Sequence, residues 1–169
     1  MLEKLCPRDQ ADSVLSLNPR ILKAQGIKGI ILDLDNTLVE WGAETIDPEL
    51  PSWIARFKEA GFRLCIVSNA LPQRVEMISR TLGIPAVPQA TKPFKTPFRR
   101  ALEILGTKPE ETAVVGDQLF TDILGGNRMD LYTIWTPPIS ETEFVSTRAV
   151  RRLERLVVKR FRKRGLWRD

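Results

Sequence analysis

The chain has 169 residues, 43% hydrophobic and 28% charged, which is the composition of one ordinary soluble globular domain with its own core. It contains no run of 18 apolar residues and no signal-peptide pattern at its start, so we expect a cytoplasmic protein without a membrane-spanning helix. There is no histidine and there are only two cysteines, which excludes Ser-His-Asp and Cys-His catalysis, His-ligated zinc and a disulfide framework.

Short apolar runs alternate with helical patterns along the chain, which is typical of βαβ units. The runs are β-branched and almost continuously apolar, which indicates strands buried on both faces. We therefore predict a doubly wound α/β fold, a parallel sheet of about five strands with helices on both faces. The predicted strands are residues 28–34, 63–67, 84–87, 112–116 and 131–135.

The helices are predicted from apolar residues that repeat with the 3.6-residue period. Three of these stripes are followed by a stop glycine, which is Gly61, Gly83 or Gly106. The predicted helices are one or two short ones within 8–25, then 50–57, 75–82, 98–105, a short one at about 120–124 before "GGN", and a long one over 142–164.

The net charge of +5 is unevenly distributed. Residues 148–169 contain ten Lys and Arg against two Asp and Glu, a local charge of +8, which leaves −3 on residues 1–147. We therefore separate a domain, 1–147, from a basic amphipathic helical tail, 148–169. The tail could lie on an anionic membrane with Trp167 at the interface, contact nucleic-acid phosphates, or dock on its own domain. The apolar residues expected near one side of its helix are Phe144, Val145, Val150, Leu153, Leu156, Val157 and Phe161.

Polar side chains follow four of the predicted strands, at the edge where ligands bind to a parallel sheet. Ordered by strand, they are Asp33, Asp35 and Thr37; Ser68 and Asn69; Lys92 and Lys95; and Asp117 and Asp122. Clustered carboxylates raise one another's pKa and need a cation to stay ionised together, and oxygen ligands favour Mg²⁺. One Asp can be a nucleophile that forms an aspartyl-phosphate, and an Asp two residues later can carry the proton.

The strings "DLDNT", "VSN", "KP" and "GDQLFTD", in this order at successive strand ends, resemble the four motifs of the haloacid dehalogenase-like superfamily of phosphatases. The resemblance covers residues 28–136. It implies Asp33 as the nucleophile and a metal ligand, Asp35 as the general acid/base with its carbonyl on the metal, and Asp117 as the second metal carboxylate. It further implies that Thr37 supports the loop, that Ser68 and the Asn69 amide bind phosphate, that Lys92 stabilises the phosphoryl charge, and that Asp122 supports the metal or the lysine.

Other interpretations of single residues stay open at this point. Ser68 could be a helix N-cap, Lys95 could replace Lys92, and Asp122 could simply complement a helix dipole. The segment after the first motif forms a flap in which Glu40, Trp41 and Glu44 are candidates for substrate contacts.

The spacing of the motifs leaves no room for an inserted cap domain. Only 28 residues lie between Asp35 and Leu64, and Lys92 follows Asn69 by 23 positions. Capless chains of this kind resemble the YqeG-type phosphatases, which are similar to phosphatases of phosphatidylglycerophosphate. This implies a Mg²⁺-dependent phosphomonoesterase for a phospholipid phosphate, with the tail as a peripheral contact on the inner face of a membrane. The alternatives are a phosphatase for soluble or macromolecular phosphates and a nucleic-acid-associated binding protein; the sequence does not specify an oligomeric state.

Overall fold

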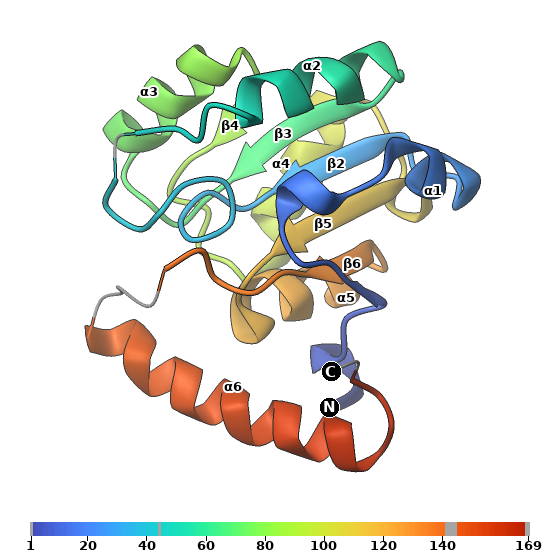
Figure 1. The fold of residues 1–169 in the computed structure, drawn as a ribbon, viewed down its shortest axis with the longest axis vertical. Coiled ribbons are helices and arrows are strands. Elements are labelled where there is room, and N and C mark those ends of the chain that lie inside the picture. Colours follow the sequence, from blue (N-terminus) through green and yellow to red (C-terminus); the bar gives the residue numbers. More distant parts are fainter. Residues whose placement is uncertain (1, 44, 141–144, 168–169) are drawn as a thin grey trace.

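The computed structural model describes residues 2–43, 45–140 and 145–167, and these form one parallel six-stranded sheet with flanking helices (Figure 1). The strand order is β1-β6-β5-β2-β3-β4, so the first long strand, β2, lies in the interior of the sheet. The predicted doubly wound α/β fold is confirmed. The strands are β1 (Asp9–Gln10), β2 (Gly29–Leu32), β3 (Arg63–Val67), β4 (Ala86–Val87), β5 (Thr112–Gly116) and β6 (Tyr132–Trp135).

Side chains of successive strand residues enter opposite layers of the core. Ile30 and Leu32 of β2 pack with the helices α1 (Pro19–Ala24), α2 (Leu50–Glu59) and α3 (Pro72–Leu82). Ile31 packs on the other face with α4 (Lys95–Leu105), beside which lies α5 (Leu124–Arg128). This alternation follows from the period of two in a strand and explains why the predicted strands are apolar throughout.

The helix ends agree with the predicted stop glycines. Gly83 and Gly106 follow α3 and α4 with φ of 63° and 60°, the left-handed conformation that glycine adopts without a steric penalty. The remaining short helices are η1 (Leu2–Leu5), η2 (Val14–Ser16), η3 (Pro109–Glu111) and η4 (Leu119–Ile123).

Two elements differ from the prediction. The sheet has a sixth strand, β1, which pairs with β6 at the edge; its two residues are too few and too polar to show strand periodicity. The helix expected to end before "GGN" continues instead, since η4 leads directly into α5, which contains Gly125 and Gly126. A side chain on either glycine would overlap Phe98 of α4 or Val114 of β5, so the pair permits close packing rather than ending a helix.

The long C-terminal helix, α6 (Val145–Lys163), lies beside the β6 side of the molecule (Figure 1). Phe161 and Trp167 pack with Leu5, Leu119 and Ile123, so the end of the tail closes over the start of the chain. Of the apolar residues expected near one side of the helix, Phe161 is buried, whereas Leu153 and Leu156 are 56% and 59% exposed, so the domain covers only part of that side. Val150 and Val157 are partly buried, Phe144 lies outside the described residues, and the side chain of Val145 is not described.

No cap domain covers the carboxyl ends of the strands in the part of the chain described here. Residues 33–49 and α2 connect β2 to β3, and only α3 and β4 lie between β3 and the loop that leads to α4. None of the described helices combines the length and the apolar character needed to cross a membrane.

Candidate active site

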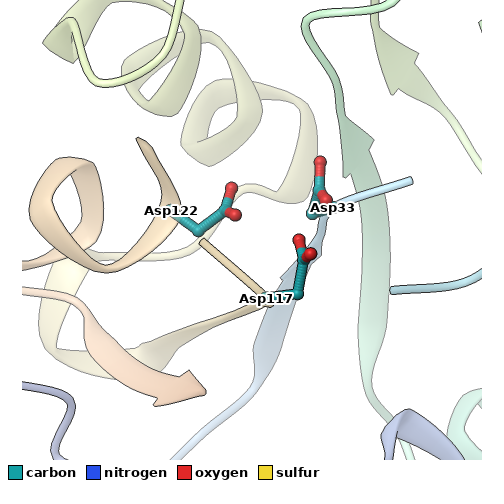
Figure 2. Close-up of side chains that lie close together, drawn as sticks. All are labelled: Asp33, Asp117 and Asp122. Carbon is teal, nitrogen blue, oxygen red and sulfur yellow. The ribbon is translucent and has the colours of Figure 1, made fainter. Parts of the chain in front are cut away.

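Three buried carboxylates meet beyond the carboxyl ends of β2 and β5. Asp33 follows β2, Asp117 follows β5, and Asp122 comes from η4, and Figure 2 shows all three pointing toward one another. Each offers one oxygen within 4.8 Å of the others. The strands lie side by side in the sheet, with Leu32 paired to Val115, and this register brings Asp33 and Asp117 together.

Lys92 lies among these carboxylates and is itself buried. Its Nζ donates to Asp33 Oδ1 at 2.5 Å, to Asp122 Oδ1 at 2.6 Å and to the Val67 carbonyl at 2.9 Å. Burial by itself lowers the pKa of Lys92, but the charges of Asp122 and Asp33 outweigh it and raise the pKa above its usual value. The lysine is therefore held in its charged form, and Asp122 is its direct partner. Lys95, by contrast, is exposed at the start of α4.

A tight turn after β2 carries the residues that follow Asp33. Asn36 has a φ of 63°, and the amides of Leu38 and Val39 return to the carbonyl of Leu34. This turn places Thr37 Oγ1 3.2 Å from Asp33 Oδ2 and 3.5 Å from Asp117 Oδ1. The Thr37 hydroxyl therefore lies between the two carboxylates and orients them.

The site holds more negative charge than its buried cations balance. Burial raises the pKa of Asp117 well above its ordinary value, and the charges of Asp33 and Asp122 act in the same direction against the opposing Arg151. Burial and the charge of Asp33 raise the pKa of Asp122 to about 6, although Lys92 opposes this. Carboxylate oxygens at this spacing could hold a hard divalent cation, which would let all three ionise together.

Gly116 permits this close arrangement at the end of β5. A Cβ at this position would overlap the side chain of Asp122, so no larger residue fits without moving that carboxylate. Glycine is therefore needed at this position because there is no space for a side chain, and not because the backbone has a positive φ.

Ser68 and Asn69 follow β3 and border the same region. Ser68 is buried, and its Oγ accepts a hydrogen bond from the amide of Ala70 at 3.1 Å. It is not the N-cap of α3, because that position is Leu71, so this alternative is wrong. Asn69 is exposed, and its Oδ1 accepts from the Lys92 amide at 2.8 Å, which ties the end of β3 to the lysine loop.

Asp35 lies at the open side of the site, where it pairs with Arg74 of α3, a residue that the sequence analysis missed. Arg74 donates to Asp35 Oδ1 from Nε at 3.1 Å and from Nη2 at 2.8 Å. The same guanidinium donates to the carbonyls of Ala43 and Glu40 at 2.5 and 3.2 Å, so it holds the flap beside Asp35. Apolar periodicity predicts α3, but no motif singles out Arg74 from its other polar residues.

An open cavity of about 510 Å³ leads to this site from solvent. It is lined by the buried Asp33 and Lys92 and by the more exposed Arg74, Trp41 and Leu71. Trp41 and Leu71 are 36% and 66% exposed, so the cavity combines a charged floor with an apolar rim. Of the expected flap residues, Glu40 contributes its carbonyl to Arg74, and Glu44 lies outside the described residues.

The C-terminal helix also reaches the site, through two residues that the sequence analysis did not identify. Arg151 forms an ion pair with Asp117, and the buried Glu154 accepts hydrogen bonds from the amides of Leu119 and Phe120 at 2.7 and 3.3 Å. In the sequence, Arg151 is one of ten basic residues in the tail, and only the direction in which α6 faces distinguishes it.

Comparison with known proteins agrees with this geometry. Residues 39–130 match the model of the haloacid dehalogenase-like hydrolase family. The chain is 40% identical over 166 residues to a probable phosphatase, YqeG, of Bacillus subtilis, covering 98% of this chain and 96% of that one. It is 32% identical over 157 residues to the chloroplastic/mitochondrial phosphatidylglycerophosphate phosphatase 1 of Arabidopsis thaliana, covering 86% of this chain and 45% of that longer protein.

Solved structures share the fold at low sequence identity. An uncharacterized protein from Listeria monocytogenes has a TM-score of 0.55 at 18% identity, covering 79% of this chain and 99% of that one. A 3-deoxy-D-manno-octulosonate 8-phosphate phosphatase from Yersinia pestis has a TM-score of 0.53 at 18% identity, covering 73% and 71%. The chain belongs to the haloacid dehalogenase-like hydrolase family and is a capless phosphatase of the YqeG type.

Proposed function

We propose that the chain is a Mg²⁺-dependent phosphomonoesterase that acts through an aspartyl-phosphate on Asp33, with a phospholipid phosphate such as phosphatidylglycerophosphate as its substrate. The observation that carries the reaction is the position of Asp33. Asp33 is buried and lines the open cavity, and its Oδ1 lies 2.5 Å from the charged Lys92 Nζ. A carboxylate next to a fixed cation is suited to attack a phosphoryl group and to balance the charge that develops on it.

In the first step, an oxygen of Asp33 bonds to phosphorus as the ester P–O bond breaks, and Asp35 donates a proton to the leaving oxygen. In the second step, Asp35 takes a proton from a water molecule that attacks phosphorus, the bond to Asp33 breaks, and inorganic phosphate leaves. Lys92 and the hydroxyl of Ser68, with the Asn69 amide, would hold the phosphoryl oxygens. All three residues line the cavity together with Asp33; Ser68 and Asn69 follow β3, and Lys92 lies in the loop after β4.

The carboxylates of Asp33 and Asp117, with the carbonyl of Asp35, are the ligands proposed for Mg²⁺. The surplus of buried negative charge and the all-oxygen donor set suit this ion. Bound Mg²⁺ would supply a positive charge that neutralises the phosphoryl oxygens. Asp122 is proposed to support Lys92, since its Oδ1 lies 2.6 Å from Nζ.

Two observations support a lipid substrate: the residues at the entrance of the cavity, and the similarity of the chain to phosphatidylglycerophosphate phosphatases. No cap restricts the cavity in the described residues, and Trp41 and Leu71 offer an apolar rim above the charged floor. Phosphatidylglycerophosphate phosphatases of Arabidopsis thaliana and Chlamydomonas reinhardtii are 32% and 30% identical to this chain. A phosphate ester whose other end is apolar fits such an entrance.

Peripheral contact with an anionic membrane, at its cytoplasmic face, is proposed through the outer face of α6. Leu153 and Leu156 are exposed there, next to the exposed basic residues Arg152, Lys159 and Arg160. Exposed leucines among cations are the pattern of a helix that lies on anionic lipid. The sequence left open that Trp167 lies at a membrane interface; in the structure it is buried against Trp135, with ring centroids 4.9 Å apart.

The test is a substrate panel of phosphatidylglycerophosphate, sugar phosphates and nucleotides, assayed with Mg²⁺ and with EDTA. We expect Mg²⁺-dependent release of phosphate, fastest from the lipid, and one phosphoryl group trapped on the Asp33 peptide after acid quenching. Asp33→Asn should abolish both signals, whereas Asp130→Asn, at an exposed position, is the matched control and should keep them.

Three outcomes would contradict the proposal in different ways. Faster turnover of a soluble phosphate than of the lipid would reject the lipid substrate but not the proposed reaction. Undiminished turnover by Asp33→Asn would reject the nucleophile. Salt-sensitive binding of DNA or RNA without turnover of any substrate would reject the enzyme.

A further inference from the structure

Arg151 of α6 holds Asp117 from the side opposite to Asp33. Its Nη2 forms an ion pair with Asp117 Oδ2, and its Nη1 donates to the main-chain carbonyl of Asp117 at 2.7 Å. The Asp117 side chain is fully buried, and that of Arg151 is 14% exposed. We propose that Arg151 is a positioning residue for the metal-binding carboxylate, so that the C-terminal helix is a structural part of the phosphatase site; this rests on the proposed Mg²⁺ requirement.

The two oxygens of Asp117 face different partners. Oδ1 lies 3.5 Å from Thr37 Oγ1, which in turn lies 3.2 Å from Asp33 Oδ2. Oδ2 faces the guanidinium of Arg151. Arg151 therefore leaves Oδ1 on the side of Asp33, where a cation shared by the two aspartates would be bound. Because one guanidinium contacts both Oδ2 and the main-chain carbonyl, it fixes the rotation of the carboxylate as well as its charge.

Glu154, one helical turn further along α6, holds the segment that follows Asp117. Its Oε1 accepts from the amides of Leu119 and Phe120, and its Oε2 lies 3.0 Å from Arg151 Nη1. Burying Glu154 is costly, and burial raises the pKa of this carboxyl even though Arg151 opposes it. The pair thus joins α6 to Asp117 and to the middle of the segment between Asp117 and Asp122, and the burial of two charged groups there carries an energetic cost that surface packing alone would not require.

Two other arginines of α6, close to Arg151 in the sequence, can be compared with it directly. Arg152 and Arg155 are exposed on the outer side of the same turns. A basic residue that served only to attract anionic partners would be expected on that outer side. Partners that hold a metal-ligating carboxylate in place affect metal affinity about 10- to 100-fold when they are removed.

The experiment compares Arg151→Met with Arg155→Met in the full chain; Arg155 is exposed one turn further along the helix. Mg²⁺ binding is measured by titration calorimetry and by the rise in melting temperature with Mg²⁺ concentration. We expect Arg151→Met to weaken Mg²⁺ binding about 10- to 100-fold, with most of the lost turnover restored at high Mg²⁺. Arg155→Met should bind Mg²⁺ as the wild type does.

Arg151→Lys covers the case in which Arg151→Met fails to fold. Lysine keeps the positive charge but cannot contact Oδ2 and the carbonyl together, so we expect an intermediate Mg²⁺ affinity in a folded protein. Equal Mg²⁺ affinity of wild type and Arg151→Lys overturns the inference if Arg151→Met does not fold, and unchanged affinity in a folded Arg151→Met overturns it directly. Tighter binding by Arg151→Met overturns it as well, because Arg151 would then compete with the cation. A wild-type chain that binds no Mg²⁺ overturns the metal requirement itself, whereas normal wild-type binding with unaffected variants rejects only the role of Arg151.

Discussion

Arg74 donates two hydrogen bonds to a single oxygen of Asp35, from Nε at 3.1 Å and from Nη2 at 2.8 Å. The two residues are 39 positions apart, and Arg74 also binds two carbonyls of the flap. The proposed acid/base is therefore held by the same side chain that holds the entrance to the cavity. The orientation of Asp35 and the position of the flap are coupled in this structure.

Removing this coupling should impair catalysis more than folding. We expect Arg74→Ala to lower kcat about 100-fold, since a displacement of about 1 Å in a catalytic group can cost this much. Steady-state kinetics at saturating Mg²⁺ and a pH–rate profile would measure the effect. Arg80→Ala, on the same helix with its side chain 83% exposed, is the control and should behave as the wild type. A normal kcat and pH profile in Arg74→Ala would show that Asp35 does not depend on this contact.

The metal-free protein should lose stability as the pH rises through the range in which its buried carboxyls ionise. Burial and the charge of Asp33 raise the pKa of Asp122 from an ordinary value of 3.8 to about 6. The folded state therefore holds more protons than the unfolded state between these values, and the free energy of unfolding falls with rising pH, by up to about 3 kcal/mol for a shift of this size. The chain has no histidine to titrate in the same range.

Urea unfolding in EDTA between pH 4.5 and 7.5 measures this slope. Asp122→Asn should flatten it, and added Mg²⁺ should stabilise the wild type more at pH 7.5 than at pH 4.5, because the carboxylates bind the ion only when ionised. An unfolding free energy that increases over this range would contradict the expectation.

Gly116→Ala should damage the site itself. The new Cβ would overlap the side chain of Asp122, so this side chain would have to move, which would disturb its contact with Lys92. We expect kcat to fall about 100-fold and overpacking to cost about 1–3 kcal/mol of stability. Gly126→Ala is the matched control, since its Cβ would overlap Val114 and Thr133 away from the carboxylates. It should lower the melting temperature by a similar amount while kcat stays within a few-fold; equal kcat in the two variants would argue against the role of Gly116.

The outer face of α6 should determine binding to anionic membranes. Replacing Leu153 and Leu156 together by Glu should weaken co-sedimentation with vesicles that contain phosphatidylglycerol by about tenfold or more, because each leucine contributes about 1.5–3 kcal/mol when buried in the interface. Ile104→Glu, at an exposed position of α4, should have no effect. Binding that is unchanged in the double variant, or that does not weaken with added salt, would exclude this face.

The sequence predicted most of the fold because the relevant signals are local. Apolar runs predicted five of the six strands, β2 to β6, and the 3.6-residue period predicted α2, α3 and α4. Glycines at φ near 60° follow two of these helices. The two-residue β1 could not be predicted, since it exists only through its pairing with β6. The sequence left open what the tail contacts, and only the structure shows Leu153 and Leu156 exposed and Trp167 packed against Trp135, because these positions depend on what the tail packs against.

The sequence by itself determined that Asp33, Ser68, Lys92 and Asp117 gather at one edge of the sheet, because the carboxyl ends of parallel strands must meet there. Tertiary structure decided which cations hold the carboxylates in place. Arg74 of α3 contacts Asp35, 39 positions away, and Arg151 of α6 contacts Asp117, 34 positions away. Both contacts depend on which side of the helix faces the site. Neither contact follows from spacing, because the side of a helix that meets the site is fixed by packing over the whole domain.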